Sequence, residues 1–266
     1  MLNKLFCALL SSLFFINYAS SEPYSVLFDS PKGTGPFPVI IISHGSGGLT
    51  NVAYDWADYF TRELGYATIA INHHQQRGFP EGGSAPPISQ ATNWQYDDLV
   101  SAMKKFKANK KIDPKQIVLA GWSAGAAMTM WGLENGEDIR KESGLKHPFR
   151  AGILFYPYMY ACNRFDFVKI TFPIIHVHGA DDDTYRFCWE NEIGDMKSDK
   201  YELVSKIYDD AVHLFDSPYA RNNCRSVGAS TGAPYPDYEL CFKYNEKAHN
   251  QSKADIKAFL AKHLSN

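Results

Sequence analysis

The sequence has little net charge and no concentration of basic residues. It carries 27 Lys and Arg against 29 Asp and Glu, a formal net charge of -2, and the basic residues are scattered along the chain. Phosphate binding needs a clustered excess of Lys and Arg, so the composition excludes nucleic acid as the main partner. Internal repeats and low-complexity tracts are lacking too. With 45% hydrophobic residues, the 266-residue chain has ample material for a large core.

Long hydrophobic runs are lacking as well, apart from a short one near the N-terminus. Lys4 precedes an apolar stretch from Leu5 to Ile16, and small residues follow at positions 19–21. This order is typical of a secretory signal peptide, so we predict that residues 1–21 are removed. The apolar stretch is too short to span a bilayer comfortably, so we expect no stable membrane anchor. The predicted location is secreted or periplasmic.

Cysteine is sparse, with five residues in the chain. Cys7 lies within the predicted signal peptide, which leaves four cysteines in the mature protein. An even number in an exported chain predicts two disulfides, with four buried thiols as the alternative, and four cysteines allow three pairings. Cys162 and Cys188 each follow an apolar run predicted to be a strand, whereas Cys224 and Cys241 bracket a Gly- and Pro-rich segment. We therefore expect the pairs Cys162–Cys188 and Cys224–Cys241.

Short apolar runs alternate with segments of helical spacing. The runs are "FPVIIISHG", "YATIAIN", "QIVLAGWS", "AGILFYP" and "FPIIHVHG", with a later strand in "YELVSKIYDDA". Helices are expected at 52–64, 96–106 and 124–133, and an amphipathic helix closes the chain from Glu246 to Leu264. Strands that are apolar on both faces and alternate with helices predict a doubly wound, mostly parallel α/β sheet. The pattern resumes after two long loops, 73–90 and 216–241, so we expect a single domain over residues 22–266.

The stretch "AGWSAGAAM" places Ser123 between Gly121 and Gly125, directly after an apolar strand and before a small-residue helix. A serine in such a sharp strand-to-helix turn projects its hydroxyl above the sheet, and the glycines leave room for the backbone. The pattern predicts a nucleophile, with a helix-capping serine as the alternative. A serine nucleophile needs a base and an orienting carboxylate, which in this arrangement follow in the order Ser, acid, His.

His213 follows the last predicted strand and is the expected base, and the acid is expected among the three adjacent aspartates 181–183. His176 and His178 lie within a strand, so packing or strand-end hydrogen bonding is expected of them. His73 and His74 begin a loop without a third metal ligand, so they are read as a solvated or substrate-facing pair. His147, His249 and His263 lie in polar surroundings and are expected at the surface.

Donors for an oxyanion are expected in "HGSGG", residues 44–48, which follows the first strong apolar strand. Its small residues let backbone N–H groups face the site. The first donor is expected at Ser46, with Gly47 as the next choice, and the second at Ala124, the residue after the nucleophile. The segment lacks the pattern and the Lys of a phosphate-binding loop. We expect neither a metal nor a cofactor.

Taken together, these motifs resemble the dienelactone hydrolase-like family of the α/β-hydrolase superfamily, from about residue 36 to the C-terminal helix. The resemblance rests on "PFPVIIISHGSGGL", "GWSAGAAM", "HGADDDT", "HLFD" and the late "YNEKA…AFLAKHL". It implies the α/β-hydrolase fold and hydrolysis of a carboxylic ester. The usual spacing of glycine, two residues and Asp in the family selects Asp182 as the acid. Two departures are Ser123, where dienelactone hydrolases use cysteine, and Asn72, where relatives have aspartate.

The sequence therefore predicts a serine hydrolase that acts through an acyl-enzyme on Ser123, Asp182 and His213. Its substrate is expected to be a small-molecule or polymeric ester. A peptidase of the same fold and a non-catalytic binding protein that retains the fold are the alternatives. Acyl length, alcohol size and oligomeric state stay open at this stage.

Overall fold

The computed structural model describes residues 24–82, 86, 88–147, 149–158, 169–191, 196–197, 199–227 and 238–264. The predicted signal peptide, 1–21, and Cys162 lie outside the described residues. None of the helices within these ranges is long and apolar enough to cross a membrane.

A seven-stranded sheet in the order β1-β3-β2-β4-β5-β6-β7 forms the centre of the molecule. Its pairings are parallel except for β1, which runs antiparallel to β3 at the edge. The predicted parallel α/β architecture is confirmed, whereas the antiparallel edge strand was not predicted. The strands are Ser25–Asp29 (β1), Phe37–Ser43 (β2), Ala67–Asn72 (β3), Ile112–Trp122 (β4), Ala151–Phe155 (β5), Ile174–Gly179 (β6) and Leu203–Tyr208 (β7).

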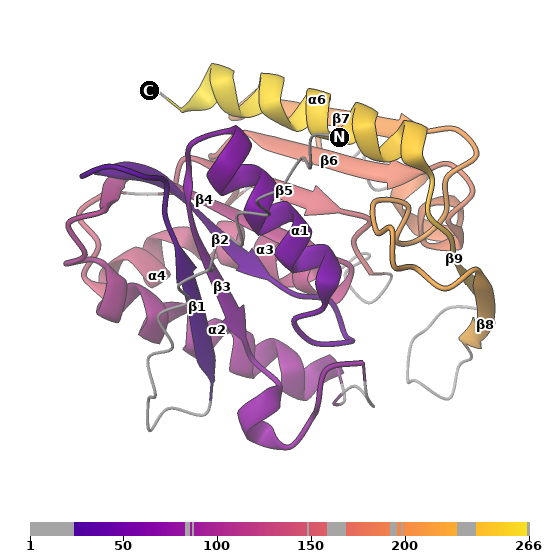
Figure 1. The fold of residues 1–266 in the computed structure, drawn as a ribbon, viewed down its shortest axis with the longest axis horizontal. Helices are drawn as coiled ribbons and strands as arrows, with labels where there is room; N and C mark the ends of the chain where they lie inside the picture. The colour runs from indigo at the N-terminus through magenta and orange to yellow at the C-terminus, as the bar shows by residue number, and fades with distance from the viewer. Residues whose placement is uncertain are drawn as a thin grey trace, which may run out of the picture.

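Helices cover both faces of this sheet (Figure 1). Helices α1 (Asn51–Asp58) and α6 (Glu246–His263) pack on one face, and α2 (Ile88–Phe106), α3 (Ala124–Glu134) and α4 (Gly136–Ser143) on the other. Successive residues of β2 enter opposite layers: Ile41 joins the α2–α4 layer and Ile42 the α1–α6 layer. Because both faces are buried at the centre of the sheet, β5, residues 39–42 of β2 and residues 117–122 of β4 are apolar without alternation.

Both segments expected to be long loops contain regular structure. Residues 73–90 include a 3-10 turn at Gln75–Arg77 and the start of α2. Within 216–241 lie β8 (Asn223–Val227) and most of β9 (Tyr238–Phe242), which pair as a separate antiparallel hairpin. A π-helical turn, Tyr59–Glu63, extends α1, and a second one follows β6 at Tyr185–Trp189. Of these departures, the Tyr185–Trp189 turn and the hairpin lie on the side of the sheet where the candidate site is found, whereas Tyr59–Glu63 leads into the amino end of β3.

Candidate active site

Ser123 sits in a strained turn between β4 and α3. Its φ of 54° and ψ of -114° place a non-glycine residue in a region that L-residues rarely adopt. A Cβ on Gly121 would lie 2.1 Å from the carbonyl oxygen of Gly125, and one on Gly125 would lie 2.2 Å from the carbonyl oxygen of Ser43. Only glycine fits these two positions, so the sequence motif reflects a steric requirement of the turn.

A continuous hydrogen-bond chain links the three residues predicted to act together. His213 Nε2 lies 3.0 Å from Ser123 Oγ, and His213 Nδ1 lies 2.7 Å from Asp182 Oδ2. All three side chains are buried. With a carboxylate at Nδ1, that nitrogen carries the proton, and Nε2 is left to accept the hydrogen bond that the serine hydroxyl donates.

Asp182 is held as a carboxylate by its surroundings. Thr184 donates two hydrogen bonds to Oδ1, from its backbone N–H (2.9 Å) and from its hydroxyl (2.7 Å). His178 Nε2 lies 3.4 Å from the other carboxylate oxygen. Burial raises the pKa of Asp182, but the imidazoles of His213 and His178 outweigh it and hold that pKa well below its usual range. The group is therefore ionised at neutral pH.

The two neighbouring aspartates have other partners. The Asp181 carboxylate forms an exposed ion pair with Arg186. Asp183 Oδ2 accepts a hydrogen bond from the backbone N–H of Glu239, at the start of β9. Of the three adjacent aspartates, Asp182 alone is hydrogen-bonded to His213.

A cavity of about 320 Å³ opens at Ser123 and His213. One wall is the 45–48 loop, and another is made by Arg225 and Phe242 of the hairpin. Among the described residues, no backbone carbonyl accepts from the N–H of Ser46 or of Ala124, whereas the N–H of Gly48 is bonded to the carbonyl oxygen of Gly45 (3.1 Å). A larger surface cavity, about 580 Å³, lies between β1, α1 and α6 and includes none of the triad residues.

The β8–β9 hairpin is fastened both to itself and to the loop of the candidate base. Cys224 and Cys241 lie opposite each other in the hairpin and are joined by a disulfide, the pairing expected from the sequence. Phe242 forms a bridge with His213, and their rings lie 5.8 Å apart. Cys188 also takes part in a disulfide. Its expected partner, Cys162, lies outside the described residues, so that pairing stays a prediction.

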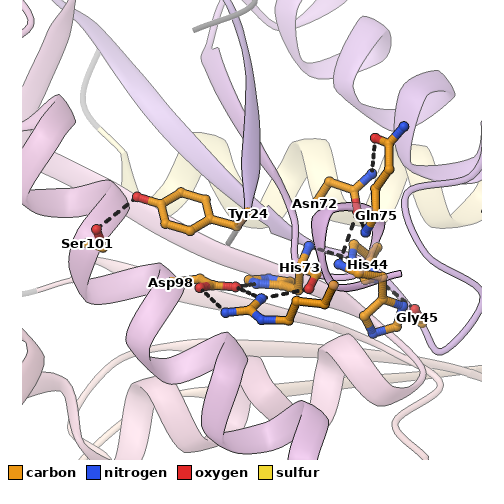
Figure 2. A network of polar contacts seen from close by, with 10 residues as sticks. Tyr24, His44, Gly45, Asn72, His73, Gln75, Asp98 and Ser101 are labelled. Atoms are coloured by element: carbon orange, nitrogen blue, oxygen red, sulfur yellow. Dashed lines mark hydrogen bonds and ion pairs between the residues drawn. The ribbon is translucent and has the colours of Figure 1, made fainter. Parts of the chain in front are cut away.

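A second buried histidine–carboxylate pair supports the 44–48 loop from behind (Figure 2). His73 Nδ1 lies 2.8 Å from Asp98 Oδ2, and the Arg77 guanidinium donates to both oxygens of Asp98 at 2.7 and 2.8 Å. The backbone N–H of His73 donates to His44 Nε2 (3.1 Å), so the proton of His44 resides on Nδ1 and is donated to the carbonyl oxygen of Gly45 (2.8 Å). The pair thus fixes the first residues of the 44–48 loop.

The expectation that His73 and His74 are solvated was wrong, because both are buried, and neither lines the cavity at Ser123. Burial and the neighbouring His73 and Arg77 lower the pKa of His74 from 6.5 to about 4. Asn72, the departure from the family pattern, accepts from the backbone N–H groups of His74 (3.2 Å) and Gln75 (3.1 Å) and so shapes the 3-10 turn. No spacing in the sequence announced that Asp98, on a helix, would enter this network.

Two further predictions about histidines have clear outcomes. His249 was expected at the surface but is buried, with its ring 5.7 Å from that of Trp56. His176 and His178 were expected to pack or hydrogen-bond within the strand. His176 Nε2 lies 3.0 Å from His178 Nδ1, and His178 Nε2 lies 2.8 Å from the Thr184 hydroxyl, so they form a line behind Asp182.

Potential metal ligands come together once in the described part of the chain, at Cys224, Glu239 and Cys241. Both sulfurs of this group are joined in the disulfide, so they do not act as thiolate ligands. The residues present therefore do not fit a metal at this place.

The fold is that of an α/β hydrolase, and comparison with known proteins places the chain within this superfamily. Residues 25–264 match the dienelactone hydrolase family, and the chain belongs to that family. A dienelactone hydrolase-like promiscuous phosphotriesterase from metagenomic libraries shares the fold, with a TM-score of 0.65, 18% identity and coverage of 91% of this chain and 92% of that one. Esterase 2 of Thermogutta terrifontis, in a structure phosphorylated by paraoxon, has a TM-score of 0.60, 17% identity and coverage of 90% and 88%.

One curated relative is an uncharacterised 31.7 kDa protein from Escherichia coli, encoded in a traX–finO intergenic region. It is 34% identical over 110 residues, which are 40% of this chain. The match spans 35% of the length of that relative.

Proposed function

We propose that this protein hydrolyses carboxylic esters through an acyl-enzyme formed on Ser123. The observation that carries the proposal is the Ser123–His213–Asp182 hydrogen-bond chain at the floor of an open cavity. Membership of the dienelactone hydrolase family supports hydrolysis in general. The two structural relatives above are an esterase and a phosphotriesterase, whose chemistry likewise begins with attack on an electrophilic centre.

In the first half-reaction, Ser123 Oγ attacks the ester carbonyl carbon while His213 Nε2 takes the hydroxyl proton. The carbonyl oxygen becomes an oxyanion, which the N–H groups of Ser46 and Ala124 would stabilise because neither is used by another backbone carbonyl in the described chain. Asp182 holds the imidazole in the required tautomer and stabilises its positive charge. His213 then gives the proton to the leaving alcohol as the carbon–oxygen bond breaks.

In the second half-reaction, water takes the place of the alcohol. His213 removes a proton from that water, the hydroxide attacks the acyl carbon, and Ser123 leaves with the proton returned by His213. The products are a carboxylic acid and the regenerated enzyme. Each step uses only the groups already described, so the proposed reaction requires no cofactor.

Export is part of this proposal. The N-terminal charge, apolar stretch and small residues match a signal peptide, and the Cys224–Cys241 disulfide suits an oxidising compartment. We therefore place the mature enzyme in the periplasm or outside the cell. Mass determination of the protein recovered from an expressing host gives the mature N-terminus, and retention of residues 1–21 would contradict this assignment.

A fluorophosphonate probe and a panel of p-nitrophenyl esters of graded acyl length test the catalytic proposal together. The probe should label the parent protein at Ser123, and the panel should rank acyl sizes that fit the cavity. Ser226→Ala, which changes an exposed serine of β8, is the matched control and should label as the parent does. A folded parent protein that neither labels nor hydrolyses any ester would refute the proposal and favour the non-catalytic alternative.

A further inference from the structure

A second carboxylate, Asp216, is fully buried beside the candidate site without touching the triad. Its Oδ2 accepts from the indole N–H of Trp56 (2.8 Å) and of Trp122 (3.0 Å), and its Oδ1 accepts from the hydroxyl of Tyr156 (2.7 Å). Asp216 forms no ion pair with the described residues, so three neutral donors hold it. Burying a carboxylate is costly, and retaining one on neutral donors alone calls for an explanation.

Asp216 and its three partners come from four places that meet at the site. Trp122 directly precedes Ser123, Tyr156 directly follows β5, and Trp56 lies on α1. Asp216 itself is three residues after His213. One carboxylate thus connects the nucleophile turn, the end of the neighbouring strand, a covering helix and the loop of the base.

The same places carry unusual backbone conformations. Ser123, Tyr156 and Leu214 have φ values of 54°, 35° and 58°, a region that residues with a side chain occupy only when their surroundings enforce it. Ser123 follows Trp122 directly, Tyr156 is itself a partner of Asp216, and Leu214 lies two positions before Asp216. The hydrogen bonds to Asp216 therefore join the three strained segments to one another.

Tyr156 also contacts the base directly. Its ring lies 4.5 Å from the His213 ring, centroid to centroid, while its hydroxyl is bound to Asp216. Any displacement of the Tyr156 ring would move the surface against which the imidazole packs. A shift of the imidazole by a few tenths of an ångström would change the 3.0 Å contact between His213 Nε2 and Ser123 Oγ.

We infer that Asp216 is a positioning residue, which sets the distance between Ser123 and His213 through Trp122 and Tyr156. This inference rests on the proposed function for its kinetic test, but the geometric claim stands independently of it. A merely structural role would predict a loss of stability with no selective effect on the chemical step.

The sharpest variant is Tyr156→Phe, because it removes one hydrogen bond to Asp216 and keeps the ring against His213. We expect kcat for a p-nitrophenyl ester to fall about 10- to 100-fold, with KM changed less than about threefold, because misplaced groups slow the chemical step. The matched control is Tyr208→Phe. Tyr208 donates a hydrogen bond to a partly buried carboxylate, that of Asp255 (3.2 Å), and like Tyr156 it packs on Phe215 (5.3 Å), but it forms no hydrogen bond to Asp216.

A loss of kcat in Tyr156→Phe that Tyr208→Phe does not share, at similar melting temperatures, supports the inference. Folded Tyr156→Phe with kcat within about twofold of the parent overturns it, as does an equal loss in Tyr208→Phe. Proton NMR of the His213 Nδ1–H resonance provides a readout that does not depend on turnover. If the parent protein proves to lack esterase activity, a shifted resonance in Tyr156→Phe still supports positioning, and an unshifted one overturns it.

Discussion

Two histidine–carboxylate pairs lie at the carboxyl ends of the strands, and only one of them lies against a serine hydroxyl. The His213–Asp182 and His73–Asp98 contacts have nearly equal lengths, 2.7 and 2.8 Å, and all four residues are buried. His213 presents its free nitrogen to a serine hydroxyl beneath a cavity. The corresponding nitrogen of His73 is buried without a hydrogen-bond partner among the described residues.

The carboxylates differ as much as the imidazoles. Asp182 is bound by neutral Thr184 and by imidazoles, so its charge is available to stabilise a protonated His213. Asp98 already neutralises the guanidinium of Arg77 through two hydrogen bonds. A short imidazole–carboxylate contact therefore does not by itself make a base. What decides is the group at the other imidazole nitrogen and the competing charge on the acid.

The largest expected difference between the two pairs is in kcat, and it appears when Ser123 or His213 is replaced. Ser123→Ala should lower kcat about 10⁴- to 10⁶-fold with the fold retained, and His213→Ala should do comparable damage. His73→Ala, made for comparison, should leave kcat within about tenfold of the parent because His73 reaches no reacting atom. Steady-state kinetics with circular dichroism checks this. Ser123→Ala with activity within tenfold of the parent would contradict the assignment of the nucleophile.

The acid of the first pair is tested by single Asp-to-Asn changes at the three adjacent aspartates. Asp182→Asn should lower kcat about 10⁴-fold, since an amide at this place favours the wrong tautomer of the base. Asp181→Asn and Asp183→Asn remove an exposed ion pair and a contact to β9, so they are the matched controls and should keep most of the activity. Inactivity of either control in place of Asp182→Asn would overturn the assignment.

In the second pair, the corresponding change should affect stability instead of chemistry. Asp98→Asn leaves the largely buried Arg77 without its counter-charge, which should reduce the free energy of unfolding by about 3–5 kcal/mol. Asp138→Asn is a control, because its pair with Lys141 is exposed and should be worth less than about 1 kcal/mol. Urea unfolding measures both. Equal losses in the two variants would show that the buried pair contributes no more to the free energy of unfolding than the exposed one.

The hairpin beside the first pair adds a covalent restraint that the second pair lacks. The disulfide closes a loop with a sequence separation of 17 residues. Replacing both Cys224 and Cys241 by Ser should lower the free energy of unfolding by about 3 kcal/mol, by freeing the unfolded chain. Because Arg225 and Phe242 of the hairpin line the cavity at Ser123, we expect the double variant to raise KM more than it lowers kcat. Unfolding curves and kinetics on the double variant test this, and an unchanged melting temperature would contradict it.

The smallest expected effect is the proton linkage of the buried histidines. The pKa of His74 is lowered from 6.5 to about 4 by burial, His73 and Arg77. Between these values the unfolded chain binds a proton that the folded chain does not, so stability is full above pH 6.5 and falls as the pH drops toward 4. His74→Gln should flatten this slope in urea unfolding from pH 7 to 4.5. An unchanged slope would mean that His74 is not linked to folding.

The strands and the turn at Ser123 were accessible from the sequence for definite physical reasons. Strand segments buried on both faces are mostly apolar, so β5, residues 39–42 of β2 and residues 117–122 of β4 appear as unbroken runs. The turn at Ser123 admits only glycine at positions 121 and 125, so it leaves a motif. The antiparallel edge strand β1 and the β8–β9 hairpin left weaker patterns, because a short strand that is only partly buried, or exposed, need not be apolar throughout.

The burial of the histidines at positions 73, 74 and 249 could not be predicted from the sequence. His73 and His74 begin a loop and His249 lies on a largely polar helix, so all three were expected to be exposed, yet they are buried because partners from distant segments cover them. Asp98 meets His73 from a helix 25 residues away in the chain. Nothing in the local sequence encodes such a meeting.

The sequence by itself determined the α/β class and the tight glycine-flanked turn at Ser123, because these depend on local sterics and on periodic burial. Tertiary structure alone decided which histidine–carboxylate pair meets a hydroxyl, and it placed Asp216 among Trp56, Trp122 and Tyr156. The physical reason is that hydrogen bonding and burial depend on distances between groups far apart in the chain. Those distances exist only once the sheet and its covering helices have packed.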